Sequence, residues 1–196
     1  MEKFYLEKPS IERKNEALEY IQEFIDLNSR IHGVGSLNKY LDDYEAWLDM
    51  ISSNWNRKVT EKLVPSHTYF LIREQDNKII GMTDIRLSLT EGLKTYGGNI
   101  GLSIRPSERK KGYGKLNLYF ALKECDLYNI KEVMVDCDQD NIASAQTIKS
   151  LGGRLTKEDY NAVSNSIVQD YWINTQESLS NNKELEIYIS KKNSME

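Results

Sequence analysis

The sequence predicts a mixed α/β fold, with a central sheet of about seven strands flanked by about four helices. Three observations support this prediction. The first 60 residues contain two segments whose apolar residues recur every three or four positions, as in amphipathic helices. From residue 68 onward, short apolar segments alternate with turn-forming residues, which is typical of an antiparallel front half of a sheet. Between residues 100 and 137 a strand, a helix and a second strand predict one β-α-β crossover.

The composition fits one domain, because 196 residues suffice to bury a sizeable core. The formal net charge is −4 and the basic residues do not follow one face, which disfavours a nucleic-acid partner. No apolar run approaches the ~20 residues of a membrane span, and the N-terminus lacks the apolar core of a signal peptide. Cys125 and Cys137 lack metal-ligand spacing. We therefore expect a cytoplasmic protein with no membrane contact, two buried thiols and no metal.

The N-terminal part is predicted to contain one strand and two helices. Residues 3–8 form a short strand, and Ser10 is a suitable N-cap for a helix whose apolar face spans residues 17–25. A loop with two glycines, Arg30 to Ser36, leads to the second helix. This helix covers residues 37–51, where apolar side chains recur at steps of three and four.

The later elements are mostly short strands. The alternation and the turn residues predict strands at 69–73, 78–88, 100–104, 133–137, 154–160 and 166–174, the last two as an antiparallel pair. Residues 176–183 are polar and are predicted to be a loop. The alternation of Leu185, Ile187 and Ile189 is compatible with a last strand.

The stretch from residue 97 to residue 127 carries the clearest functional signal. Its strand alternates apolar and small side chains, and Pro106 ends that strand because proline lacks an N–H. Gly112 and Gly114 then open an apolar helix. Backbone N–H groups and the dipole at the start of a helix favour negative charge. A phosphate site is therefore predicted here, beside the basic residues Arg105, Arg109, Lys110, Lys111 and Lys115.

Two linked motifs narrow the kind of site. The loop does not match G-x-x-x-x-G-K-[ST], because Leu116 follows Lys115, and Asn117 stands where G-x-G-x-x-G needs its third glycine. It does match R-x-x-G-x-G, from Arg109 to Gly114. Downstream, the strand at 133–137 is followed by Asn141-Ile142-Ala143-Ser144 and by a helix closing on Leu151-Gly152. In these motifs residues 68–175 resemble the GNAT superfamily of N-acetyltransferases.

This resemblance implies a GNAT-like fold and an enzyme that moves the acetyl group of acetyl-CoA to a primary amine, without a metal. The strands at 100–104 and 133–137 would splay apart, with the pantetheine arm of acetyl-CoA between them. The N–H of Ile104 would polarise the thioester carbonyl, a catalytic role that needs only backbone. The residues implied to contact acetyl-CoA are Leu102, Ser103, Ile104, Arg109, Lys110, Lys111, Gly112, Tyr113, Gly114, Lys115, Asn141 and Ser144.

The acceptor amine must lose a proton. A lysine-like amine has a pKa near 10.4, so removing its proton at pH 7 costs about 4–5 kcal/mol, and a general base helps. Asp136 is the first candidate catalytic base, because it interrupts an apolar strand shortly before Asn141, where some family members carry a carboxylate base. The alternatives are a structural, salt-bridged Asp136 and an Asn141 that only caps the helix. Asp84 and a water molecule are the other candidate bases.

The group that protonates the departing thiolate is absent from its usual place. Family members often carry a tyrosine in the last helix of the motif, and Ile148 stands at that position. Tyr160 or Tyr171 is a candidate to reach the thiolate from a neighbouring strand, although either also suits a packed strand aromatic. The remaining alternative is a thiolate that leaves unaided.

Three functions remain open: acetylation of a small-molecule amine, acetylation of a protein α-amine or lysine, and binding of CoA without catalysis. We expect a single domain, 1–196, that is a monomer or a homodimer. Residues 1–60 would form its acceptor side, 68–175 its cofactor-binding core and 176–196 a C-terminal extension. In the Arg30–Ser36 loop, His32 is a candidate for the wall of the acceptor pocket, with a solvated loop histidine as the alternative.

Overall fold

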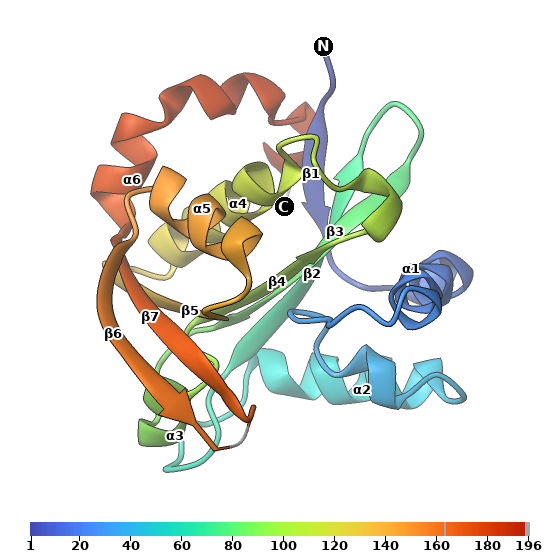
Figure 1. Ribbon diagram of the computed structural model, residues 1–196. Coiled ribbons are helices and arrows are strands. Elements are labelled where there is room, and N and C mark those ends of the chain that lie inside the picture. Colours follow the sequence, from blue (N-terminus) through green and yellow to red (C-terminus); the bar gives the residue numbers. More distant parts are fainter. Residues whose placement is uncertain (163, 195–196) are drawn as a thin grey trace.

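The computed structural model describes residues 1–162 and 164–194 of the chain (Figure 1). Four antiparallel strands form one sheet in the order β1-β2-β3-β4, and three antiparallel strands form a second sheet in the order β5-β7-β6. The first sheet comprises β1 (Phe4–Glu7), β2 (Ser66–Arg73), β3 (Lys78–Arg86) and β4 (Ile100–Ile104). The second comprises β5 (Glu132–Asp138), β6 (Arg154–Asn161) and β7 (Ser166–Asn174).

Helices cover both faces of the four-stranded sheet. The α-helices are α1 (Lys14–Asp26), α2 (Tyr44–Trp55), α3 (Glu91–Thr95), α4 (Tyr113–Leu127), α5 (Ile142–Ser150) and α6 (Thr175–Asn181). Figure 1 shows α1 and α2 on one side of the sheet and α4 and α5 on the other. In the part of the chain that the structure describes, no helix is both long enough and apolar enough to cross a membrane.

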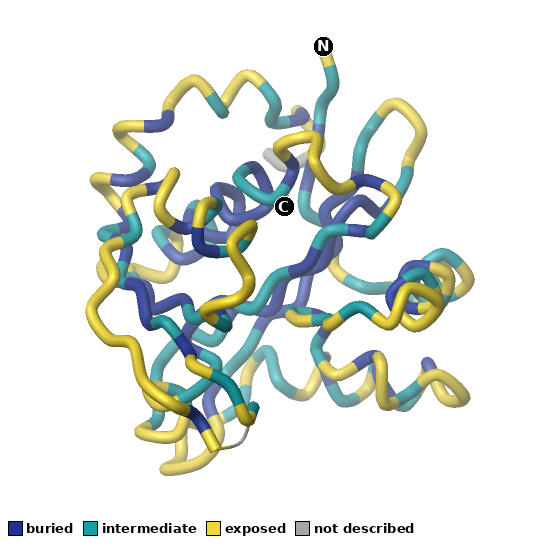
Figure 2. The backbone as a smooth tube through the Cα atoms, viewed as in Figure 1, coloured by how far each residue is buried: buried dark blue, intermediate teal, exposed yellow. Residues whose placement is uncertain are grey.

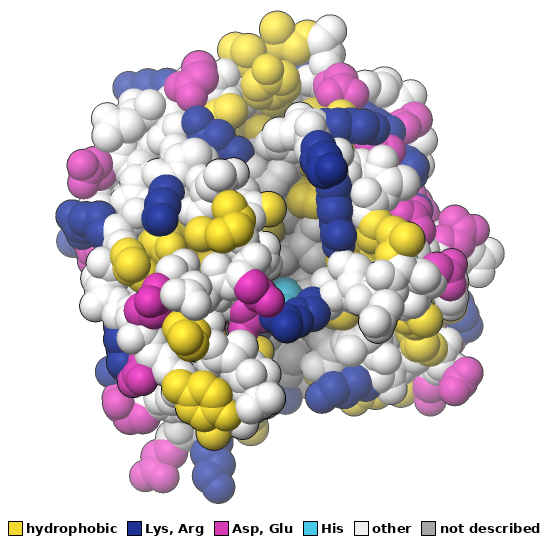
Figure 3. All heavy atoms as spheres, viewed as in Figure 1, with side chains coloured by type: hydrophobic (Ala, Val, Ile, Leu, Met, Phe, Trp, Pro, Cys, Tyr) yellow, Lys and Arg dark blue, Asp and Glu magenta, His cyan; other side chains and the backbone are white. Residues whose placement is uncertain are grey.

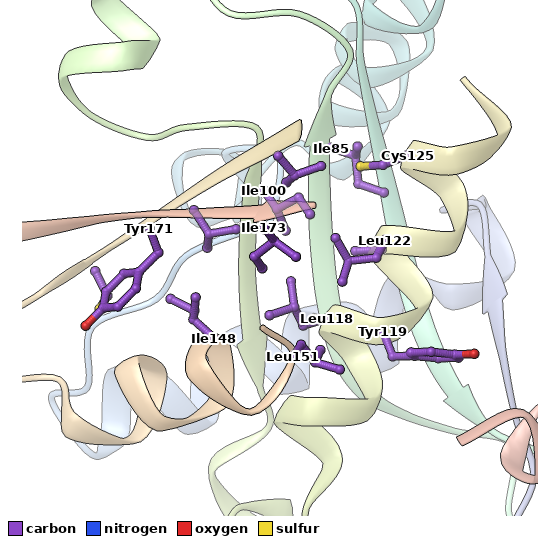
Figure 4. Packing of buried hydrophobic residues seen from close by; sticks show 14 of the residues in the cluster. Ile85, Ile100, Leu118, Tyr119, Leu122, Cys125, Ile148, Leu151, Tyr171 and Ile173 are labelled. Carbon is purple, nitrogen blue, oxygen red and sulfur yellow. The ribbon is translucent and has the colours of Figure 1, made fainter. Parts of the chain in front are cut away.

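The hydrophobic core of the described residues has two parts, one on each face of the four-stranded sheet. On one face α1 and α2 bury Tyr20, Phe24 and Trp47 against Phe70 and Met82 of the sheet. On the other face α4 packs against β3, β4 and β5, and it is buried along most of its length (Figures 2 and 4). At roughly 25 cal/mol for each Å² of apolar area removed from water, this burial supplies the main stabilisation of the layered fold.

The predicted mixed α/β, GNAT-like fold class is confirmed, and seven strands form within the described residues, with an antiparallel front half. The prediction of a single central sheet is wrong: α4 connects β4 to β5 as predicted, but the two strands separate and belong to different sheets. The number of helices exceeds the expected four, because the sequence analysis missed the short helix α3 and the helix α6.

The predicted continuous helix over residues 37–51 is wrong. Residues Leu37–Lys39 form a 3₁₀ turn, and α2 begins only at Tyr44. Asp43 caps α2, because its side chain accepts a hydrogen bond from the Ala46 N–H at 3.0 Å. Both parts face the same core, so the apolar period continues across the break. Ser10 likewise makes no side-chain cap, since a 3₁₀ turn at Ile11–Arg13 precedes α1.

Both C-terminal predictions are also wrong. The polar segment after residue 174 is helical, because Asn174 caps α6 by accepting from the Glu177 N–H at 3.0 Å. A 3₁₀ helix at Lys183–Tyr188 replaces the expected last strand. Its Glu186 accepts hydrogen bonds from Tyr119 and Lys123 of α4, so this segment lies along the helix rather than extending a sheet.

Candidate active site

Strands β4 and β5 are joined at one end only, by Asn99. Its N–H donates to the Met134 carbonyl at 2.7 Å, and its side-chain Oδ1 accepts from the Met134 N–H at 2.9 Å. Its Nδ2 donates to the Arg86 carbonyl of β3 at 3.0 Å. One buried amide therefore links the two sheets. Beyond it no β4–β5 ladder forms among the described residues, so the strands separate.

The open edge of β4 follows from its pairing with β3. Arg86 N–H donates to the Asn99 carbonyl, and Arg105 N–H donates to the Ile80 carbonyl. Hydrogen-bonded pairs alternate in an antiparallel ladder, so the backbone of Gly101 and Ser103 also faces β3. The backbone groups of residues 100, 102 and 104 point the other way, toward the gap.

Strand β5 presents a matching open edge. Gln139 N–H donates to the Ile167 carbonyl of β7, so by the same alternation the backbone of Asp136 faces away from β7. The gap is therefore bounded by two strand edges. Among the described residues the N–H groups of Leu102 and Ile104 have no hydrogen-bond partner, and an extended ligand with amide groups could pair with them as another strand would.

A small cavity of about 150 Å³ occupies the closed end of the gap. Asp136 lines it and accepts a hydrogen bond from the Gly97 N–H at 2.7 Å. Tyr96, His32 and Arg86 line it from other elements. The cavity therefore brings a carboxylate, a phenol and an imidazole within reach of the β4 edge.

A wider groove of about 870 Å³ runs from this end of β4 past the start of α4. Figure 3 shows the surface hollowed along this line, with basic side chains on its rim. Every residue predicted to contact acetyl-CoA lines the groove except Lys111, whose ammonium group instead pairs with Glu108 at 2.7 Å. These contacts to acetyl-CoA stay a prediction, but the geometry brings the residues together.

The loop at the groove has the backbone that a phosphate site requires. Gly112 precedes α4 with a φ of +85°, in the left-handed region that favours glycine. A side chain there would meet no atom within 4 Å, so glycine is needed for its conformation and not for space. The first N–H groups of α4 have no intrahelical partners and are available to an anion.

Glu108, which the sequence analysis missed, anchors this loop. Its buried carboxylate accepts hydrogen bonds from Arg73, Lys78 and Lys111 at 2.7–3.2 Å. Burial opposes ionisation, but the hydrogen bonds from Arg73, Lys111 and Lys78 outweigh it and lower the pKa of Glu108 to about 2. The carboxylate is therefore charged at neutral pH and fixes the loop to β2 and β3.

Comparisons with known proteins agree with this geometry. The family model of the acetyltransferase (GNAT) family matches residues 17–152. The chain belongs to the GNAT family. It is therefore an acetyltransferase, and acetyl-CoA is its acetyl donor. No curated protein sequence matches the chain.

Solved structures of GNAT acetyltransferases share its fold. The microcin C7 self-immunity acetyltransferase MccE, in complex with acetyl-CoA and AMP, is 17% identical with a TM-score of 0.63, covering 88% of this chain and 92% of that chain. A GNAT acetyltransferase from Bacillus anthracis is 13% identical with a TM-score of 0.60, covering 90% and 99%. Mutant forms of the spermidine/spermine N-acetyltransferase SpeG from Vibrio cholerae are 10% identical with a TM-score of 0.61, covering 92% and 99%.

The two candidate bases of this GNAT protein lie in different surroundings. Asp136 lines the small cavity. Asp84 lines neither the cavity nor the groove, and its carboxylate accepts a hydrogen bond from Thr68 at 2.9 Å and pairs with Arg86 at 3.5 Å. Asp136 is therefore the better placed of the two. Asn141 caps α5 through the Ser144 N–H at 3.1 Å, and it also lines the groove, so one side chain is placed for both of its expected roles.

Neither tyrosine expected as proton donor reaches the site. Tyr160 is exposed and donates to Asn165, while Tyr171 is buried and donates to Gln169 at 2.7 Å. Figure 4 shows the Tyr171 ring beyond Ile148, with its hydroxyl directed away from β4. Ile148 itself lines the groove. The tyrosine that does reach the cavity is Tyr96, which the sequence analysis missed.

Tyr96 gave no sequence signal because it lies in a turn between α3 and β4. Its hydroxyl has no hydrogen-bond partner among the described residues. Burial, and then the charges of Asp136 and Asp138, raise the pKa of Tyr96. The phenol therefore remains protonated at neutral pH and is available as a hydrogen-bond donor in the cavity.

The Arg30–Ser36 loop lies against β4. A side chain at Gly33 would come within 2.2 Å of the Gly101 carbonyl oxygen, so only glycine allows this close approach. Arg30 reaches across the gap to the Asp138 carboxylate at 2.5 Å. His32, between them, lines both the cavity and the groove.

Proposed function

We propose that the protein acetylates the primary amine of a small molecule, using the gap between β4 and β5 as its reaction site. The observation that carries this proposal is the pair of unpaired strand edges facing one cavity that also contains Asp136. Acetyl-CoA supplies the activated acetyl group. The backbone N–H of Ile104 binds an amide of its pantetheine arm, and the first N–H groups of α4 bind its pyrophosphate.

Two groups of the chain act on the reacting atoms. The N–H of Leu102, which lines the same cavity as Asp136, donates a hydrogen bond to the thioester carbonyl oxygen and stabilises the negative charge that develops there. Ile104, expected in this role from the sequence, lines only the groove, on the side of the glycine loop. Asp136 accepts the proton that the amine loses as the new C–N bond forms and the C–S bond breaks. Ile148 replaces the usual tyrosine and neither Tyr160 nor Tyr171 lies in the site, so the departing thiolate takes its proton from water or from Tyr96, whose side chain lines the same cavity.

The size of the cavity supports a small amine head group. About 150 Å³ admits an acetyl group and the head group of the reacting amine. We therefore propose that residues 1–60 contribute the acceptor side through the Arg30–Ser36 loop, and that residues 68–175 bind acetyl-CoA. Among the proteins of similar fold, SpeG is a spermidine/spermine N-acetyltransferase, which agrees with a small-molecule acceptor.

Thiol release from acetyl-CoA tests this proposal. We expect one or more small primary amines in a broad panel to accelerate release, with an acetylated amine as product. Peptides with free α-amines or lysines should be poor acceptors. Release with peptides alone would contradict the small-molecule acceptor. Tight CoA binding without release for any amine or peptide would contradict the enzyme role.

The Asp136→Asn variant tests the base. Its kcat/KM should fall roughly 10²–10⁴-fold, the usual cost of losing a general base, while CoA affinity stays constant. The matched control is Asp159→Asn, which removes an exposed carboxylate from β6 and should leave the rate unchanged. An unchanged rate in Asp136→Asn would show that Asp136 is not the general base and would favour a water molecule in that role.

A further inference from the structure

Asp170 of β7 lies directly opposite Asp136 of β5. The Gln139–Ile167 hydrogen bond fixes the alternation in this ladder, so the Asp136–Asp170 pair is a non-hydrogen-bonded one. In such pairs the side chains lie on the same face of the sheet and their Cβ atoms are at their closest, about 4.5–5.5 Å apart. Two carboxylates therefore stand side by side next to the cavity that Asp136 lines.

Asp170 is buried without a partner. It is 7% exposed, and among the described residues its carboxylate has no hydrogen bond and no ion pair. The Asp136 carboxylate accepts one hydrogen bond among the described residues, and its donor, the Gly97 N–H, is uncharged. Two adjacent carboxylates that are not both paired with cations resist double ionisation.

We propose that Asp136 and Asp170 act as one coupled pair of carboxylates, and that the neighbouring charge of Asp170 makes the ionised Asp136 a stronger base for the acceptor amine. This inference rests on the proposed function of Asp136. The ionised pair carries two negative charges, and it keeps one when Asp136 takes the proton released as the amine forms its C–N bond; the two carboxyl groups then share that proton. Transfer of that proton to water restores the pair. Asp170 is thus a positioning residue for the proton and does not itself touch the substrate.

No cation near Asp136 and Asp170 pairs with Asp170 among the described residues, because the nearby cations are paired with other carboxylates. On β6 Lys157 pairs with Asp159 at 3.4 Å, and on the loop Arg30 pairs with Asp138 at 2.5 Å. Burial is the first cause that raises the pKa of Asp170, and the charge of Asp136 is the second, with Asp159 adding to them and Lys157 opposing. The other titratable or charged groups that line the same cavity are Tyr96, His32, Cys137, Asp138 and Arg86. Arg86 is already bonded to the Gly97 carbonyl and paired with Asp84.

Titration of the free enzyme tests proton sharing without any substrate. In protein labelled with ¹³C at the aspartate side-chain carboxyls, Asp136 and Asp170 should titrate in two coupled steps separated by more than about one pH unit. In Asp136→Asn the remaining Asp170 should titrate in one step, at lower pH than the upper step of the pair. Independent titration of both carboxyls near their ordinary values, unchanged by either substitution, would overturn the proposal.

The pH profile tests the consequence for catalysis. In Asp170→Asn the acidic limb of the kcat/KM profile should move to lower pH by about one unit, because Asp136 no longer faces a second carboxyl group. The control Asp159→Asn removes the same charge from the neighbouring strand and should move the limb far less. If the acidic limb of the kcat/KM profile lies at the same pH in Asp170→Asn and in the wild type, the proposal is contradicted. If no amine is acetylated, the proposed function fails, whereas the titration still decides whether the pair shares a proton.

Discussion

Single residues in this protein act through specific neighbours. The Glu108 carboxylate accepts hydrogen bonds from three cationic side chains. Among the described residues no cation pairs with Asp170, and the nearby Lys157 pairs with Asp159 instead. The pKa values of the two carboxyls therefore shift in opposite directions, downward for Glu108 and upward for Asp170. One carboxylate stabilises the loop that is proposed to bind phosphate, and the other belongs to the proposed coupled pair.

Glu108→Gln should lower stability in a pH-dependent way. The pKa of Glu108 falls from 4.5 to about 2 on folding, which corresponds to roughly 3 kcal/mol of stabilisation. Since the folded-state value is the lower one, this stabilisation is complete above about pH 5 and disappears as the pH falls toward 2. Denaturant unfolding should therefore give a difference between wild type and variant that is large at pH 7 and shrinks below pH 4.5.

A constant difference across that range would contradict the role of the charge. The control is Glu91→Gln, because Glu91 is exposed and pairs only with Lys94. Its effect should stay near zero at every pH, as is usual for surface ion pairs.

At the scale of elements, β4, the glycine loop and α4 form the unit that we propose binds acetyl-CoA. The strand leaves an open edge toward β5, and the helix directs its first N–H groups at the groove. Gly112 connects the two in a left-handed conformation. The chemistry of the unit is therefore mostly backbone chemistry, which tolerates sequence change everywhere except at the loop.

Gly112→Ala should weaken CoA binding at least tenfold, because alanine in the left-handed region costs about 1 kcal/mol or more and the loop will shift to relieve it. Gly152→Ala is a matched control. Gly152 has a φ of +84°, and a side chain at either position meets no atom within 4 Å. Both variants should lose similar stability, and calorimetry should find the loss of CoA affinity only in Gly112→Ala. Equal affinity in both would contradict the pyrophosphate role of the loop.

The elements that sequence patterns predicted well are those with strong local signals. The strand 100–104, the helix after Gly112 and the cap at Asn141 all follow from residues adjacent in the chain. The break before α2 was hidden because both sides of it contribute to one apolar face. The helix α6 was missed because its residues are mostly polar and its packing against α4 is encoded by no local pattern. Asn174 and Glu177, which cap its start, were the local signal that could have indicated it.

In the candidate site, too, residues with local sequence signals could be predicted and residues defined by tertiary contacts could not. The groove residues could be predicted from a motif, whereas Tyr96, Glu108 and Asp170 could not. Tyr96 and Glu108 lie in turns, and their roles arise from distant partners such as Asp136 and Arg73. The role proposed for Asp170 depends on the β5–β7 register, which places it opposite Asp136 and cannot be read from the sequence.

At the scale of the whole molecule, two sheets are held together so that a gap remains between them. Asn99 uses both backbone groups and both ends of its side chain to join β3, β4 and β5. Every one of these bonds lies at the closed end of the gap. The halves are also joined by the hydrogen bond from Gly97 to Asp136, by the Arg30–Asp138 ion pair and by the apolar packing of α4 and α5 (Figure 4).

Asn99→Ala should destabilise the protein by about 3 kcal/mol, because the buried Met134 N–H and Arg86 carbonyl would each lose a partner. Acetyl-CoA affinity should fall as well, since the separation of the strands is no longer fixed. Asn182→Ala is the control, because its buried amide bonds only the nearby Ser178 carbonyl. Denaturant unfolding should show a smaller loss in the control, with CoA affinity retained. Equal losses of stability and affinity in both would contradict a special role for Asn99.

The measurement that tests the central claim most directly is amide hydrogen exchange at β4, read residue by residue by NMR with and without saturating acetyl-CoA. The N–H groups of Leu102 and Ile104 face the gap and have no partner among the described residues, while the N–H of Ser103 is already paired with β3. We predict that acetyl-CoA slows exchange strongly at Leu102 and Ile104 and leaves Ser103 nearly unchanged. Exchange at Leu102 and Ile104 that stays fast in the saturated complex would contradict acetyl-CoA binding along the open edge of β4.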